Sequence, residues 1–157
     1  MLNFNYRLNI VKFTFKKSER LNSKKVIEQL FDKKGRETNQ SVFLYPFRVS
    51  YVQGVESEEL KVESENEFDG LSTLNAQSLN HNSQVLISVS KRFFKHAVDR
   101  NLIKRRTREA YRLNKHLLLQ KPASQIPVYI AFVYIAKTIE EYAKIEKSMK
   151  AIFQKMV

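Results

Sequence analysis

The chain contains no cysteine and no tryptophan, and it has only three glycines and three prolines in 157 residues. The absence of cysteine excludes a disulfide framework and a zinc site with cysteine ligands. So few glycines argue against a glycine-rich loop that cradles phosphate. No apolar run approaches the roughly 18 residues of a membrane span, and the first residues lack the continuous apolar stretch of a signal peptide. We therefore expect a cytoplasmic protein that does not bind membranes.

Catalytic and metal-binding patterns are also missing. The sequence has no GxSxG, Walker-type, HExxH or DxD pattern. The three histidines, His81, His96 and His116, lack the spacing of metal ligands. Asp99 and Glu109 are ten residues apart, so on one helix their carboxylates do not converge. We expect no catalytic residue, no metal site and no cofactor bound by the protein alone.

Positive charge is what the sequence has in excess. Lys and Arg number 28 against 16 Asp and Glu, giving a formal net charge of +12 and a pI of about 9.9. Residues 53–83 hold seven acids and one base, a local charge of −6, so the other 126 residues carry +18. This composition favours a polyanion as partner. It predicts one domain over residues 15–157 with an acidic loop insertion at 53–83, preceded by an N-terminal arm at 1–14.

The densest basic stretch runs from Lys91 to His116, with ten Lys or Arg and two acids. From Ile103 onward its apolar and small residues recur at helical spacing and form one arc. That arc comprises Ile103, Thr107, Ala110, Tyr111, Asn114, Leu117 and Leu118, while Asn101, Lys104, Arg105, Arg108, Arg112 and Lys115 lie opposite. A solvated surface helix normally mixes charges for pairing along the helix. An anionic membrane would need a more apolar opposite face. Nucleic acid is the partner that fits this helix best.

The remaining elements complete an α+β pattern. A short helix is predicted over 24–34 with Ser23 as N-cap and Gly35 as stop, and a buried strand over 84–90. Pro127 begins an apolar strand that we expect in the centre of the sheet. Thr138 and Glu141 suggest a capping box for a closing helix, whose apolar face comprises Tyr142, Ile145, Met149, Ile152, Phe153 and Met156. The pattern predicts one small sheet with helices packed against it.

Residues 42–52 read as a strand that carries a row of aromatic side chains. Phe43, Tyr45, Phe47, Val49 and Tyr51 alternate with Val42, Leu44, Arg48 and Ser50, and Pro46 indicates an edge strand or a bulge. An aromatic row of this kind has two interpretations. It either packs in the core or stacks on unpaired bases from an open sheet face.

The stretch SVSKRFFKHAVDRNLIKRRTREAYR resembles the signature of the bacterial ribonuclease P protein subunit. The matching positions are Ser88, Val89, Ser90, Lys91, Arg92, Ala97, Arg100, Asn101, Lys104, Arg105, Arg108, Glu109, Tyr111 and Arg112. The resemblance extends to Glu19–Leu21, Phe31, the 42–52 strand and the strand after Pro127. It implies a small mixed sheet packed with three helices and a left-handed βαβ crossover.

The resemblance also implies a role. In that family the protein binds a catalytic RNA and the single-stranded 5′ leader of precursor tRNA, and the RNA removes the leader with Mg²⁺. It assigns catalytic-RNA contacts to Lys91, Arg92, Lys95, Arg100, Asn101, Lys104, Arg105, Arg108 and Arg112. It assigns the leader cleft to Ile27, Phe31, Phe43, Tyr45, Phe47, Val49, Tyr51, Ser88 and Ser90. The expected assembly is one protein monomer with one RNA.

Several positions depart from the family's pattern. Leu102 stands at the third position of the Arg-Asn-Arg motif, with Arg106 as a candidate replacement charge, and Leu86 replaces a glycine. Tyr134 and Ile135 occupy a site that is basic in the family. The alternative that the sequence leaves open is a stand-alone RNA-binding module of ribosomal-protein type. A self-contained nuclease finds no carboxylate cluster to support it.

Overall fold

The computed structural model describes residues 13–32, 39–53 and 83–156. Its strands form one four-stranded sheet in the order β1-β2-β4-β3. Neighbours pair antiparallel except β3 and β4, which are parallel and are joined through α2 as a βαβ crossover. The elements in chain order are η1 (Lys17–Glu19), α1 (Lys24–Phe31), β1 (Asn39–Leu44), β2 (Phe47–Gln53), β3 (Gln84–Val89), α2 (Ala97–Asn114), α3 (His116–Leu119), η2 (Ala123–Gln125), β4 (Pro127–Tyr134) and α4 (Tyr142–Lys155).

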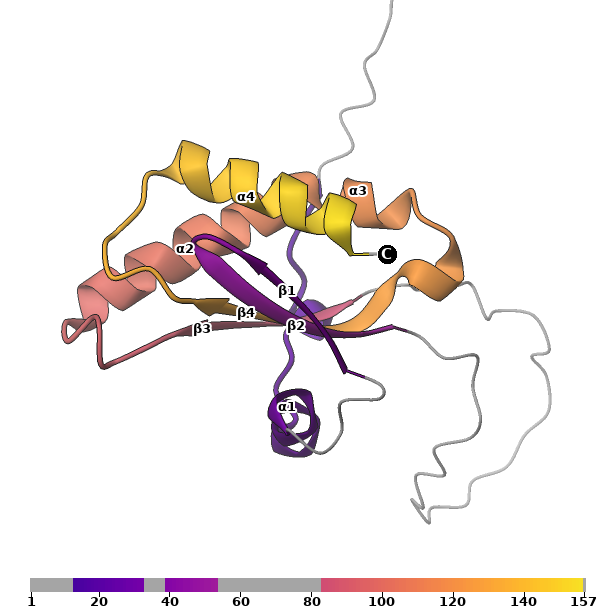
Figure 1. The fold of residues 1–157 in the computed structure, drawn as a ribbon, viewed down its shortest axis with the longest axis horizontal. Coiled ribbons are helices and arrows are strands. Elements are labelled where there is room, and N and C mark those ends of the chain that lie inside the picture. Colours follow the sequence, from indigo (N-terminus) through magenta and orange to yellow (C-terminus); the bar gives the residue numbers. More distant parts are fainter. Residues whose placement is uncertain (1–12, 33–38, 54–82, 157) are drawn as a thin grey trace, which may run out of the picture.

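The sheet is the middle layer of the molecule. Helices α2 and α4 lie on one face, and α1 lies on the other (Figure 1). This arrangement confirms the predicted α+β class, with a mixed sheet and three main helices. It also confirms the strand after Pro127 as central, because β4 lies between β2 and β3. Both faces of the sheet are therefore covered, but by different amounts of helix.

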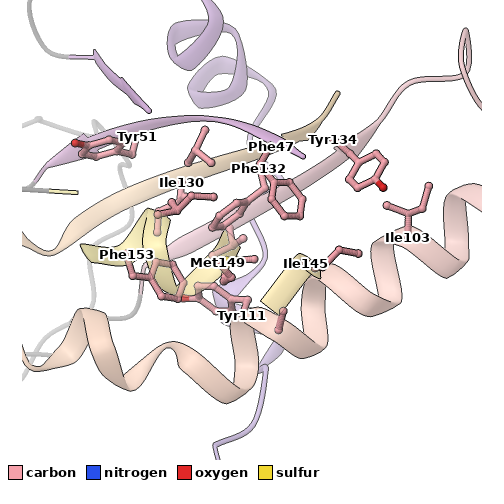
Figure 2. Packing of buried hydrophobic residues seen from close by; sticks show 14 of the residues in the cluster. Phe47, Tyr51, Ile103, Tyr111, Ile130, Phe132, Tyr134, Ile145, Met149 and Phe153 are labelled. Carbon is pink, nitrogen blue, oxygen red and sulfur yellow. The ribbon is translucent and has the colours of Figure 1, made fainter. Parts of the chain in front are cut away.

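The main core lies between the sheet and the α2–α4 layer (Figure 2). Aromatic rings from β2, β4, α2 and α4 meet there edge to face, with Phe47 5.6 Å from Tyr134 and Tyr111 6.1 Å from Phe153 between ring centroids. Edge-to-face contacts of this kind are favourable beyond the area that they bury. This core fixes α2 rigidly on the sheet.

Helix α2 confirms the predicted division of its surface. Ile103, Thr107, Ala110, Tyr111 and Asn114 are buried, as is Leu118 in α3. The two polar members of this arc are satisfied within the helix, because the Thr107 hydroxyl donates to the Ile103 carbonyl and the Asn114 amide to the Ala110 carbonyl, each at 2.8 Å. The apolar face predicted for the closing helix is likewise confirmed in α4, where only Tyr142 stays partly exposed.

The prediction of a single strand over 42–52 is wrong. The chain forms two strands, β1 and β2, and turns back between them at Tyr45 and Pro46, which are linked by a cis peptide bond. Leu44 pairs with Phe47 and Phe43 with Arg48 across the turn. Proline cannot donate to a ladder, and here it occupies the turn rather than a bulge. The consequence is that Phe43 and Phe47 lie on opposite faces of the sheet.

Two helix ends also differ from their predicted positions. Helix α1 ends at Phe31, with Asp32 as its C-cap, rather than at residue 34. The capping box at Thr138 and Glu141 is wrong, because Glu141 itself is the N-cap and the Thr138 hydroxyl donates to Glu140 instead. Predictions for Gly35, for the arm up to residue 12 and for most of the acidic loop lie outside the described residues.

A polar cluster fastens the β1–β2 turn to the start of α4. The Tyr45 hydroxyl donates to the Glu140 carboxylate, and the Lys144 ammonium pairs with the same carboxylate at 2.8 Å. Hydrogen bonds from Lys144 and Tyr45 hold the pKa of Glu140 at about 2, well below its usual range. The Ser148 hydroxyl donates to the Tyr45 carbonyl at 2.8 Å. The turn is therefore held on the α4 side of the sheet.

Candidate nucleic-acid interface

The basic side chains that the sequence assigns to RNA fall into two groups, apart from Arg100, which binds the turn before α2. One group makes no side-chain hydrogen bond or ion pair within the described residues. It comprises Lys91, Arg92, Lys95, Lys104 and Arg105, on α2 and on the turn that precedes it. We call these five residues the open basic surface. Asn101 is exposed beside them.

The turn from residue 90 to 96 is supported by α2. One guanidinium nitrogen of Arg100 donates to the Phe94 carbonyl at 2.8 Å and to the Lys95 carbonyl at 2.6 Å. At the start of the turn the Arg92 backbone N–H donates to the Ser90 hydroxyl at 3.2 Å. Arg100 and Ser90 therefore shape the turn that presents Lys91, Arg92 and Lys95.

The second group binds the N-terminal segment, residues 13–21. Arg112 forms a bidentate pair with Glu109 and donates to the Phe13 carbonyl at 2.6 Å. The guanidinium of Arg108 lies 5.9 Å from the centre of the Phe15 ring. These side chains already have partners in the protein, so they offer less charge to a ligand than the sequence suggests.

Lys115 is the strongest example of an internally used charge. Its ammonium lies 2.7 Å from a carboxylate oxygen of Glu19 and donates to the Thr14 carbonyl at 2.7 Å. The Glu19 side chain is 2% exposed and that of Lys115 13% exposed. Lys115 thus lies on the predicted basic face but serves to anchor the N-terminal segment on α2.

Leu102, which stands at the third position of the family's Arg-Asn-Arg motif, lies on the side of α2 that faces α4. It is 37% exposed and lines a cavity of about 470 Å³ together with Tyr142 and Arg106. Arg106 donates to the Glu140 carbonyl at 2.7 Å. Arg106 therefore holds the segment before α4, and it does not simply replace the charge missing at position 102.

A cleft lies on the opposite face of the sheet, beside the C-terminal end of α1. Its volume is about 640 Å³. The hollow exists because Ser41 and Ser50, which pair across β1 and β2, leave little side-chain volume beneath the helix. The lining residues are Leu30, Phe31, Asp32, Asn39, Gln40, Ser41, Arg48, Ser50 and Val133.

Some of the predicted leader-cleft residues lie on this face. Phe31 is 46% exposed and lines the cleft. Phe43 is 68% exposed and is paired with Arg48, so it flanks the cleft. Ile27 is half-buried in the small cluster beneath α1. Ser88 lies two residues after Leu86 of that cluster in β3, so it lies on the same face of the sheet.

Four predicted cleft residues are placed elsewhere, which corrects their assignment. Phe47, Val49 and Tyr51 belong to the main core and are at most 3% exposed. They have no surface to offer to RNA. Tyr45 is bound to Glu140 and Lys144 on the side of α4, across the sheet from α1. Of the two interpretations left open for the aromatic row, core packing is the correct one for Phe47, Val49 and Tyr51.

The residues of β1 and β2 that do line the cleft are absent from the predicted set. Arg48 and Ser50 alternate with the buried aromatic residues and so point to the α1 face. The alternation itself was visible, but the aromatic row was given to the wrong face. The signal for the open face was that polar residues, Arg48 and Ser50, occupy alternate positions of the strand.

Within the described ranges, no group of three His, Asp or Glu side chains is placed to hold a metal ion. No helix among these residues is long and apolar enough to cross a membrane.

Known proteins resemble this chain over most of its length. The family model "Ribonuclease P" matches residues 15–157. Proteins described as "Ribonuclease P protein component" from two strains of Porphyromonas gingivalis are each 33% identical to it over 141 residues, which cover 88% of this chain and 82% of each relative.

Proposed function

This chain belongs to the ribonuclease P protein family, and from that premise we propose that it binds the catalytic RNA of ribonuclease P and the 5′ leader of precursor tRNA. The family supplies the protein component of a tRNA-processing endoribonuclease. In this proposal the chain assists removal of the leader, and the RNA subunit supplies the catalytic groups and binds the Mg²⁺. The assembly would be one protein with one RNA in the cytoplasm.

The open basic surface supports the first contact. Its five side chains lack protein partners within the described residues, and they lie on α2 and the adjoining turn, which the main core and Arg100 hold in place. Unpaired cations on a rigid element attract phosphates and release counterions when they bind them. This unpartnered charge is the observation that carries the proposal.

The cleft beside α1 supports the second contact. It offers an exposed aromatic ring from Phe31, the exposed residue Arg48 and small polar side chains from Ser41 and Ser50. Aromatic stacking combined with positive charge is how proteins bind unpaired nucleotides. The two surfaces use different faces of the sheet, so one protein is able to contact two segments of RNA.

The test is cleavage of a precursor tRNA at low Mg²⁺ by a bacterial ribonuclease P RNA, with and without this protein. We expect the protein to restore the activity of the RNA. A Lys104→Ala/Arg105→Ala variant should restore it less well because it loses two open charges. The matched control is Lys147→Ala/Lys155→Ala, which removes the same charge from exposed positions on α4.

Other outcomes would contradict the proposal. If the protein binds RNA but never stimulates the RNA subunit, the stand-alone RNA-binding module is correct. Cleavage by the protein without RNA would reveal a protein active site. Equal losses in the α2 variant and the α4 control would show that net charge, rather than the open basic surface, determines binding.

A further inference from the structure

Among the described residues that line the cleft beside α1, Arg48 is the one cation. Arg48 lies on β2 with Phe43 as its register partner on β1 and Val133 as its partner on β4. Neither neighbour carries charge, and the Arg48 side chain makes no hydrogen bond or ion pair within the described residues. Arg48 is exposed and lines the cleft, so its guanidinium is available to a ligand there.

The other lining groups set the shape of that ligand. Phe31 presents its ring from α1, whereas the small side chains of Ser41 and Ser50 leave space on the sheet side of the cleft. Asn39 and Gln40 are engaged with Gln29 and Gln53 at 2.6 and 3.2 Å. Asp32, at the end of α1, is the acidic lining residue. A flat group that stacks on Phe31 fits this site with one edge directed at Arg48.

A guanidinium donates hydrogen bonds and accepts none. Guanine presents two adjacent acceptors, O6 and N7, on one edge and can accept a hydrogen bond at each from one arginine. Adenine and cytosine place an amino donor on the corresponding edge, which opposes another donor. Uracil offers a single acceptor there. Arg48 therefore favours guanine over the other three bases.

We propose that Arg48 is a specificity-determining residue that selects guanine at one position of the precursor-tRNA leader, with the base stacked on Phe31. The inference rests on the proposed function, since it assumes that the leader occupies this cleft. The alternative role for Arg48 is a contact with a leader phosphate, which would carry no base preference.

The experiment uses the reconstituted holoenzyme and a set of precursor tRNAs with unstructured uridine-rich leaders. A single guanosine or adenosine is moved through successive leader positions, and kcat/KM is measured for each substrate. For the wild-type protein we expect kcat/KM with guanosine to exceed that with adenosine at one position by roughly 5- to 150-fold, the range of a good bidentate contact.

Two substitutions at position 48 test the mechanism. Arg48→Ala should abolish the preference at that position. Arg48→Gln should shift it toward adenosine, because a glutamine amide matches the N6 and N7 groups of adenine. An inverted preference cannot arise from a merely structural defect. Lys147→Ala, on α4 across the sheet, is the control and should keep the guanosine preference.

The outcomes separate this inference from the proposed function. If Arg48→Ala slows cleavage of every leader equally, Arg48 contacts phosphate and the guanine assignment is wrong. If the wild-type holoenzyme is fully active but shows no guanosine preference, the inference also fails while the proposed function stands. If the wild-type protein does not stimulate the RNA at all, the proposed function fails first.

Discussion

Lys115 shows how one residue of a basic helix can serve the fold instead of a ligand. Its ammonium is the described partner of the buried Glu19 carboxylate, at 2.7 Å. We predict that Lys115→Met, which keeps most of the side-chain volume, lowers the free energy of unfolding by about 3 kcal/mol because it leaves Glu19 buried without its counter-charge. Urea unfolding followed by circular dichroism measures this loss.

The double variant Glu19→Gln/Lys115→Met distinguishes the ion pair from simple packing. It removes both charges, so it should recover most of the stability lost in the single variant. A useful comparison is Lys150→Met, whose pair with Glu146 is largely exposed and should contribute less than about 1 kcal/mol. A loss as large in the double variant as in Lys115→Met would mean that the pair itself contributes little.

Helix α2 separates its charges into open and engaged ones, and their roles in RNA binding should differ accordingly. Arg105 is exposed and unpaired within the described residues, whereas Arg112 is bound by Glu109 and Phe13. We predict that Arg105→Ala flattens the salt dependence of binding to ribonuclease P RNA by about 0.7–0.9 in the slope of log K against log salt, which is the effect of one phosphate contact. Arg112→Ala should change the slope by less than half of that.

The measurement is a filter-binding or fluorescence titration over a range of KCl concentrations, with both variants checked for native circular dichroism. Equal changes of slope for the two variants would show that the Glu109 pair opens when RNA binds. In that case the sequence, which places both residues on one basic face, would describe the interface better than the free structure does.

What the sequence could predict at this scale depended on the length of each pattern. The buried arc of α2 repeats over about three turns, and its members from Ile103 to Asn114 were identified correctly because many positions agree. The β1–β2 hairpin was not recognised, because the turn at Tyr45 and Pro46 lies inside one continuous alternating pattern. Alternation alone also does not say which face of a strand is covered. Along β2 the alternation was correct, but the row of aromatic side chains was assigned to the open face, and Arg48 was left out of the predicted site in this way.

Partners inside the protein were also beyond the reach of the sequence. Nothing in the spacing of Arg112 or Lys115 shows that residues 13–19 lie against them, since the contact joins positions about a hundred residues apart. The family resemblance assigned Arg112 to the catalytic RNA, and helical spacing placed Lys115 on the same basic face. Only the fold shows which of them the N-terminal segment already occupies.

At the scale of the whole molecule, the two proposed RNA surfaces depend on two hydrophobic clusters of different size. The α2–α4 face is held by the main core, which includes Phe132, Tyr134 and Phe153. On the α1 face, the buried members of the cluster among the described residues are Leu21, Leu30 and Ala131. Because fewer apolar groups hold α1, the cleft is the part of the molecule that a single core substitution should loosen first.

We therefore predict that Leu30→Ala weakens recognition of the leader without weakening binding of the catalytic RNA. Leu30 is 3% exposed, and truncating a buried leucine costs about 2–5 kcal/mol, here concentrated on the α1 cluster. The holoenzyme with this variant should lose its preference for precursor over mature tRNA while its affinity for the RNA subunit is retained. Leu118→Ala, in the main core, is the matched control, since it should lower overall stability comparably but keep the preference for the leader. If both variants lose the leader preference to the same extent, global stability rather than the seating of α1 governs the cleft, and the two surfaces are not separable.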